Sequence, residues 1–277
     1  GSNPSIILKT KGKNIQIMYP YVNKSVSFVT SSDPLSEIKK IMKDFKAADI
    51  KGLPRFFGGF VGYIGYDMAR FFEKLPDKNP DDLKLPDSIF ILTDSILVFD
   101  HVNHTIKIIV NVILPKKGKN PSRIKGAEAY SNAIKKIESI HRDLKKPLIE
   151  KENKKKKTKH KNITSNFKKS EFQDAVIKAK GYIKRGDIIQ VVLSQRFKIN
   201  IDKDPLDIYR NLRSLNPSPY MFFLKLNEAI LIGSSPEMLL RCEDGIVQTR
   251  PIAGTRPRGK NEKEDLKLEK ELLNDSK

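Results

Sequence analysis

The first half of the chain alternates apolar and polar residues over short stretches, a pattern that predicts β-strands. Strands are expected in SIILKT (5–10) and KNIQIMYP (13–20), and again, joined by hairpins, in SIFILTDSILVFDHVNHTIKIIVNVIL (88–114). Apolar residues recur at helical spacing in PLSEIKKIMKDFKAA (34–48) and RIKGAEAYSNAIKKIESIHRDL (123–144). These two segments are therefore predicted to be amphipathic helices.

Between them, the stretch RFFGGFVGYIGYDMARFFEKLP (55–76) places glycines among aromatic residues, at Gly58, Gly59, Gly62 and Gly65. Glycines in such a setting predict closely packed strands or a close approach of two backbones. The stretch lacks the Lys-Ser/Thr ending of a P-loop and the strand-to-helix context of a dinucleotide fingerprint. Both nucleotide-binding motifs are therefore excluded.

The second half opens with a strong helix signal. Ser170 and Gln173 have the spacing of a capping box, and Gly186 is a suitable helix end. One face of this helix would carry Phe172, Val176, Ala179 and Ile183.

Apolar runs and turn signals then alternate towards the C-terminus. We expect a strand in DIIQVVLSQRFKINI (187–201), a helix in DPLDIYRNLRSL (204–215) and a strand in YMFFLKL (220–226). A tight turn at Asn227 and Glu228 leads into hairpin-connected strands within 229–254. This order favours an α+β fold, with antiparallel sheets packed against helices, over a doubly wound sheet.

Composition divides the chain at a polar, lysine-rich tract. We predict an N-terminal domain at 1–145, a linker or insertion at 146–165 and the first half of a second domain at 166–277. The final segment, NEKEDLKLEKELLNDSK, is expected to be a charged helix that runs off the end of the chain without a glycine cap or a proline. The chain is therefore interpreted as a fragment truncated at both ends, in which Gly1-Ser2 is either native or a cloning remnant.

The net charge of +20 over 277 residues raises the possibility of a nucleic-acid-binding module. However, the densest basic run, KENKKKKTKHK (151–161), contains no arginine and no aromatic residue, whereas nucleic-acid grooves usually combine both. A solvated, lysine-rich surface is the favoured interpretation, and the nucleic-acid module is kept as the alternative.

Cysteine and histidine contribute little chemistry. The single cysteine, Cys242, excludes an internal disulfide and is expected to be small and partly buried, while His101 and His104 flank an exposed turn. The chain has no apolar run of membrane-spanning length and no signal peptide, so a soluble cytoplasmic protein is expected.

The stretch TRPIAGTRPRG (249–259) surrounds small residues with three arginines. Gly254 would let a backbone N–H approach a bound group closely, Thr255 adds a hydroxyl, and arginines attract anions. The segment alone is equally consistent with a basic surface turn.

Four stretches occur in a specific order: GDIIQVVLSQRF (186–197), NPSPYMFFL (216–224), GSSPEMLLR (233–241) and TRPIAGTRPRG. Together they resemble the large subunit, component I, of anthranilate synthases, a family of chorismate-utilising enzymes. The opening residues 1–5 and FFGGFVGYIGYD resemble the N-terminal domain of that subunit. The resemblance covers nearly the whole chain except the lysine tract.

The resemblance implies that the second domain binds chorismate, a small rigid dicarboxylate. The segment of Ala253, Gly254 and Thr255 would hold the substrate, and a larger side chain at Gly254 would fill space that the ring needs. Glu237 is implied as the acidic residue that handles the 4-hydroxyl leaving group, although a carboxylate at a helix N-terminus is an equally good explanation for it.

Two positions separate this chain from relatives that make other products. Isochorismate-forming enzymes carry a lysine base where Gln190 stands, and aminodeoxychorismate synthases typically carry a lysine nucleophile where Ala253 stands. Glutamine is not a base and alanine is not a nucleophile, so direct attack by ammonia remains. Aminodeoxychorismate synthase-like and isochorismate-forming activities are kept as alternatives.

The resemblance also implies partners. Pro219, Tyr220 and Met221 match residues that line a tryptophan pocket in feedback-inhibited relatives. Ammonia would come from a glutamine amidotransferase subunit, component II. The Mg²⁺ ligands of the family are expected beyond Lys277, so no metal site is expected in this sequence and the chain alone is expected to be inactive. Unpaired strands of the interrupted domain would favour association.

Two interpretations remain open for Arg256 and Arg258. They either raise the local concentration of anions or pair with carboxylates of the following helix, such as Glu262 and Glu264. The second is favoured.

Overall fold

The computed structural model describes residues 3–48, 50–114, 126–147, 162–250 and 254–275. The chain forms two compact units, one of Gly1–Ile149 with Leu224–Leu231 and one of Glu150–Phe223 with Ile232–Lys277, here called unit 1 and unit 2. Helices and antiparallel sheets are both present, so the fold class is α+β as predicted. The predicted domain ranges 1–145, 146–165 and 166–277 stay a prediction, and most of the lysine tract lies outside the described residues.

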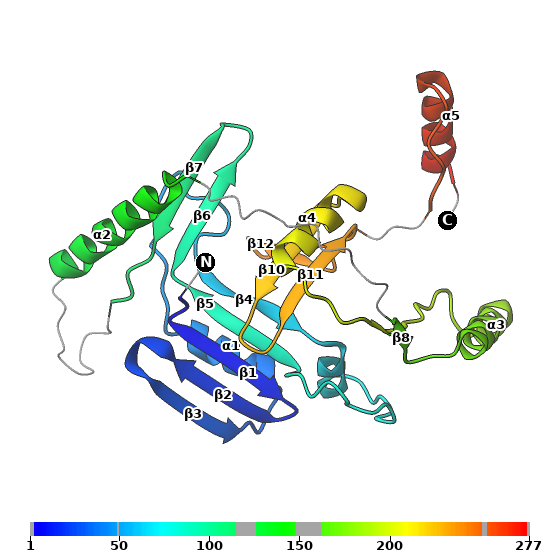
Figure 1. Ribbon diagram of the computed structural model, residues 1–277, viewed down its shortest axis with the longest axis horizontal. Coiled ribbons are helices and arrows are strands. Elements are labelled where there is room, and N and C mark those ends of the chain that lie inside the picture. The colour runs from blue at the N-terminus through cyan, green and yellow to red at the C-terminus, as the bar shows by residue number, and fades with distance from the viewer. Residues whose placement is uncertain (1–2, 49, 115–125, 148–161, 251–253, 276–277) are drawn as a thin grey trace. The chain divides into compact units, whose positions relative to one another are not determined.

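Unit 1 is built on a five-stranded antiparallel sheet of order β3-β2-β1-β5-β4 (Figure 1). Its strands are β1 (Ile6–Lys11), β2 (Asn14–Tyr19), β3 (Lys24–Val29), β4 (Gly59–Ile64) and β5 (Ser88–Thr93). In β1 and β2, alternate residues are buried, which is why the sequence pattern predicted these strands. Edge strand β3 was missed because its residues are mostly exposed and leave no burial pattern to read.

The core of unit 1 lies on one face of this sheet. Its buried apolar members are Ile6, Leu8, Ile15, Ile17 and Leu92. Ile38 and Ile41 of helix α1 (Pro34–Met42) and Phe45 pack against them. The helix starts at Asp33, whose carboxylate accepts a hydrogen bond from the backbone N–H of Ser36 at 3.0 Å. It ends six residues earlier than the predicted 34–48.

Close packing explains the glycines of the aromatic stretch. Gly62 lies in β4 opposite Phe90 of β5, and a Cβ at Gly62 would overlap the carbonyl oxygen of Ile89. A Cβ at Gly65 would lie 2.9 Å from the carbonyl oxygen of Asp87. The predicted close backbone approach is confirmed. A short 3₁₀ helix, η2 (Tyr66–Phe71), follows, and a second one, η1 (Pro20–Val22), links β2 to β3.

Unit 1 also contains a long hairpin and a second α-helix. Strands β6 (Ser95–Asp100) and β7 (Thr105–Val110) pair in register, and helix α2 (Gly126–Leu144) packs on β7 (Figure 1). The turn between β6 and β7 exposes His101 and His104, as predicted. Ala129 and Ala133 are the buried residues of α2.

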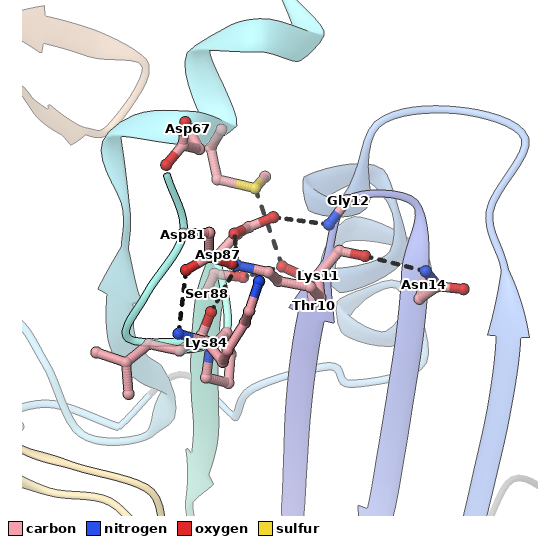
Figure 2. Close-up of polar contacts among 12 residues, drawn as sticks. Thr10, Lys11, Gly12, Asn14, Asp67, Asp81, Lys84, Asp87 and Ser88 are labelled. Carbon is pink, nitrogen blue, oxygen red and sulfur yellow. Dashed lines mark hydrogen bonds and ion pairs between the residues drawn. The ribbon is translucent and has the colours of Figure 1, made fainter. Parts of the chain in front are cut away.

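Polar contacts attach the long loop before β5 to the turn between β1 and β2 (Figure 2). The carboxylate of Asp87 accepts a hydrogen bond from the backbone N–H of Gly12 at 2.6 Å and lies 3.1 Å from the ammonium of Lys11. Asp81 pairs with the same ammonium at 2.7 Å, and this contact raises the pKa of Lys11 and lowers that of Asp81. Underneath, the buried hydroxyls of Thr10 and Ser88 lie 2.8 Å apart.

The described part of unit 2 contains three helices and short strands. Its helices are α3 (Lys169–Arg185), α4 (Pro205–Leu215) and α5 (Glu262–Leu273). Strands β8 (Thr164–Ser165) and β9 (Phe197–Lys198) pair, as do β12 (Arg241–Glu243) and β13 (Ile246–Gln248). Hairpin β10 (Tyr220–Lys225) and β11 (Ile230–Ser235) forms as predicted, and its tip, residues 224–231, belongs to unit 1.

Several predictions for unit 2 were wrong. The strand expected at 187–201 is reduced to β9, because the described residues supply only β8 as a hydrogen-bonding neighbour. The predicted capping box of Ser170 and Gln173 is not used: α3 begins at Lys169, and the carboxylate of Glu171 accepts the N–H of Lys168 at 2.9 Å. Gly186 does end α3, with a left-handed φ of 78°.

Two further predictions need correction. Helix α5 ends at Leu273 with Asn274 as its C-cap and does not run to the end of the chain. Cys242, expected to be partly buried, is exposed. Across the described ranges, no helix combines the length and the apolar character that crossing a membrane requires.

Candidate functional site

The segment after Ala253 is held against helix α5 by hydrogen bonds and ion pairs; we call residues 254–260 the strap. The backbone N–H of Gly259 donates to Asp265 Oδ1 at 2.7 Å, and the N–H of Lys260 donates to Glu264 Oε2 at 2.8 Å. At Asn261 the chain turns into α5, where the Asn261 side chain caps the helix by accepting the N–H of Glu264 at 3.0 Å.

Arg256 and Arg258 of the motif pair with carboxylates near α5. Arg258 lies 2.9 Å from Asp265 Oδ2, and Arg256 lies 2.7 Å from Asp275 Oδ2. The favoured interpretation, pairing with carboxylates, is therefore confirmed. The suggested partners Glu262 and Glu264 are wrong, because the strap runs antiparallel to the helix and brings other carboxylates within reach.

The pKa of the Asp265 carboxyl is lowered, first by the backbone N–H of Gly259 and then by the Arg258 guanidinium. A donor that points at one carboxylate oxygen and a cation at the other both favour the ionised form. Asp265 is thus the residue at which backbone and side-chain contacts of the strap converge.

Of the two glycines in the strap, only Gly259 is required by its surroundings. A Cβ at Gly259 would overlap the backbone nitrogen of Asp265. Among the described residues, a Cβ at Gly254 would meet only Leu272 Cδ1, at 3.1 Å, and Gly254 does not have a left-handed φ. An effect of Gly254 on a substrate would therefore come from the space beside it and not from an unusual backbone conformation.

The other implied substrate residues are placed in different ways. Thr255 is exposed, and its carbonyl oxygen accepts a hydrogen bond from Arg256 at 3.0 Å. Ala253 lies outside the described residues.

Glu237 and Gln190 stand on two other segments of unit 2. Glu237 lies in a bend after β11, where Ser235 Oγ donates to the Glu237 carbonyl oxygen at 2.9 Å. No helix begins at this position, so the explanation of Glu237 as a helix-terminal carboxylate is wrong. Gln190 is exposed in the segment without helix or strand between α3 and β9. The roles predicted for Glu237, Gln190 and Thr255 in catalysis and substrate selection stay predictions.

The predicted tryptophan-pocket residues lie at the start of β10. Pro219 and Tyr220 are exposed, and Met221 is half-buried. Because side chains alternate along a strand, Met221 shares a face with Phe223, which stacks edge-on against Tyr209 of α4 at 5.9 Å. Tyr220 points to the opposite face, so a pocket that includes both would have to wrap around this end of the strand.

Sequence reasoning missed the partners of these motifs. Gly233 of GSSPE faces the ring of Phe222, and a Cβ there would overlap that ring. Asp265 contacts the strap six residues before it in sequence, which no local pattern signals. The sequence feature that could have pointed to Asp265 is its position in the acidic first turn of α5, shortly after a glycine.

The described residues do not fit a magnesium site. They contain no group of three or more His, Cys, Asp or Glu side chains placed to hold a metal ion. In unit 1, a hollow of about 540 Å³ lies over β1 to β3, where Lys9 pairs with Glu228. None of the residues implied for chorismate lines this hollow.

Comparisons with known proteins agree with these motifs. The sequence model of the family described as chorismate binding enzyme matches residues 4–277. Anthranilate synthase component 1 of Acetivibrio thermocellus is 45% identical over 285 residues, which cover 100% of this chain and 55% of that protein. The component 1 of Aquifex aeolicus is 44% identical, over 93% of this chain and 51% of that protein.

A solved structure is similar as well. The crystal structure of anthranilate synthase component I from Streptococcus pneumoniae TIGR4 superimposes with a TM-score of 0.72 at 28% identity, covering 99% of this chain and 56% of that one. The chain therefore spans about half the length of the relatives that it matches.

Proposed function

Because the chain belongs to the family of chorismate binding enzymes, we propose that its parent protein is an anthranilate synthase component I. The proposed reaction converts chorismate and ammonia to anthranilate and pyruvate. The observation that carries this proposal is the 45% identity to a component 1 relative across 100% of the chain. The Gln190 and Ala253 positions support it against the alternative products.

In the proposed reaction, ammonia forms a C–N bond to the ring as the 4-hydroxyl leaves as water. Loss of the enolpyruvyl group as pyruvate then makes the ring aromatic. Glutamine at position 190 does not deprotonate water, and alanine at position 253 does not form a covalent intermediate. With glutamine and alanine at these two positions, ammonia is the remaining nucleophile. We propose that Glu237 protonates the departing hydroxyl.

The strap would supply the substrate contacts. A backbone N–H at Gly254 and the Thr255 hydroxyl are donors for a chorismate carboxylate, and the absence of a Cβ at Gly254 leaves room for the ring. Arg256 and Arg258 are already paired with carboxylates, so they are assigned to holding the strap and not to the substrate.

For the complete protein we further propose a lyase of tryptophan biosynthesis in the cytoplasm. Its cofactor would be Mg²⁺, its partner a glutamine amidotransferase subunit, component II, and its feedback inhibitor L-tryptophan at Pro219, Tyr220 and Met221. These assignments rest on the family resemblance. The described residues contain no group of three or more His, Cys, Asp or Glu side chains that could hold this ion.

Product identification tests the proposal. The complete protein is incubated with chorismate, ammonium and Mg²⁺, and the products are separated by chromatography. We expect anthranilate and pyruvate in equal amounts. Isochorismate or aminodeoxychorismate as the end product would refute the assignment.

A further inference from the structure

The strap is fixed to α5 at both ends of the helix. Near the C-terminal end of the helix, Arg256 pairs with Asp275, and Gly254 lies beside Leu272. At the N-terminal end, Gly259 and Arg258 meet Asp265. The strap therefore runs along the helix in the opposite direction, and Thr255 lies between two residues that contact the C-terminal end of the helix, Gly254 and Arg256.

We propose that Asp265 is a positioning residue for chorismate, which acts through Gly259 and the strap to hold Gly254 and Thr255 in place. This inference rests on the proposed function, because chorismate contacts at Gly254 and Thr255 are part of it. Asp265 itself has no assigned contact with substrate and is therefore not a catalytic residue.

Among the contacts of Asp265, the one with the Gly259 backbone carries the effect. The Arg258 side chain is 92% exposed, and an ion pair so open to water contributes little. The Gly259 N–H, by contrast, donates at 2.7 Å to a half-buried carboxylate, a short and charge-assisted geometry. The glycine also lets the two backbones approach each other, because a Cβ there would overlap the nitrogen of Asp265.

The substitutions Asp265→Ala and Asp265→Asn separate the acceptor from the charge. Alanine removes the acceptor for Gly259, whereas asparagine keeps a carbonyl oxygen that can accept the same N–H. Glu269→Ala is the matched control, because it removes an exposed carboxylate from the same helix.

Steady-state kinetics of the complete enzyme give the first readout. Gly254 and Thr255 are proposed to bind chorismate, and loss of a substrate-binding contact raises KM, so for Asp265→Ala we expect the KM for chorismate to rise about tenfold or more. The KM for ammonium should stay within about twofold, and Asp265→Asn and Glu269→Ala should remain near wild type. Partial unfolding would lower kcat alone and leave both KM values unchanged.

Hydrogen exchange of the peptide that covers the strap gives a second readout, independent of turnover. We expect Asp265→Ala to accelerate exchange at Gly259, and Asp265→Asn to retain protection. An unchanged KM for chorismate in Asp265→Ala, or equal defects in Asp265→Asn and Asp265→Ala, would overturn the positioning role. A wild-type enzyme that does not convert chorismate would instead refute the proposed function, which keeps the two failures distinguishable.

Discussion

Unit 1 and unit 2 are organised in opposite ways. In unit 1, alternate residues of β1 and β2 are buried, and Leu8 has no exposed surface. In unit 2, none of the described residues is buried, and Ile189 and Leu239 are 97% and 92% exposed. The motifs that identify the family are concentrated in the unit whose described residues enclose no core.

This difference shows how the two units hold their shape. Unit 1 gains stability because folding removes apolar side chains from water. This stabilisation is roughly proportional to the apolar area that is buried. The strap of unit 2 is held by individual hydrogen bonds and ion pairs to α5. Substitutions should therefore act on folding in unit 1 and on site geometry in unit 2.

The largest expected effect is that of Leu8→Ala. Leu8 is fully buried between β2 and β5, so its truncation should lower the free energy of unfolding of unit 1 by about 3 kcal/mol. Urea denaturation measures the change. Val192→Ala, at a residue that is 81% exposed, is the control and should cost less than about 0.5 kcal/mol. An equal loss in the free energy of unfolding for the two variants would contradict the difference between the two units.

A glycine pair sharpens the comparison further. Gly62→Ala should destabilise unit 1 by roughly 2 kcal/mol, because its Cβ collides with a backbone carbonyl that cannot move without disturbing β5. In Gly254→Val, the new Cβ meets, among the described residues, only the end of the flexible Leu272 side chain, so folding should persist while turnover of the complete enzyme falls sharply. Thermal melts and chorismate kinetics measure the two effects. Wild-type kinetics for Gly254→Val would show that the segment is only a turn.

The sequence predicted those helices and strands that depend on the order of apolar and polar residues within the element itself. The strands around Leu8 and Ile17 were found because alternate residues are buried, and α4 was found because Asp204 and Pro205 mark its start. The prediction of a strand at 187–201 failed because a strand needs a hydrogen-bonding partner. The residues of the segment itself do not show whether a neighbouring strand is present. Likewise, Thr255 was predicted from the family resemblance, and its role stays a prediction, whereas the contacts of Asp265 depend on the path of the backbone after Gly259.

The smallest expected effect concerns Glu37, a buried carboxylate at the start of α1. It accepts hydrogen bonds from Lys40 at 2.8 Å and Thr30 at 2.7 Å, and these contacts lower its pKa in the folded state. Ionised Glu37 therefore stabilises unit 1 above the ordinary glutamate pKa of about 4.3, and this stability is lost as the pH falls through the lowered folded pKa.

Glu37→Gln tests this dependence. At pH 7 it should cost about 1 kcal/mol, and the difference from wild type should vanish as the pH falls below about 4. Glu138→Gln, at an exposed position of α2, is the control. Urea denaturation at several pH values measures the difference, and a cost that does not change with pH would rule out the ionised carboxylate as its source.

The central claim is that unit 2 carries the chorismate site through the strap. Anthranilate fluorescence tests it most directly, recorded over time with chorismate, Mg²⁺ and excess ammonium. We predict a steady rise for the complete enzyme, a rise at least tenfold slower for its Thr255→Ala variant, and a flat trace for the 277-residue chain alone. Undiminished production by Thr255→Ala, or steady production by the 277-residue chain, would contradict the account.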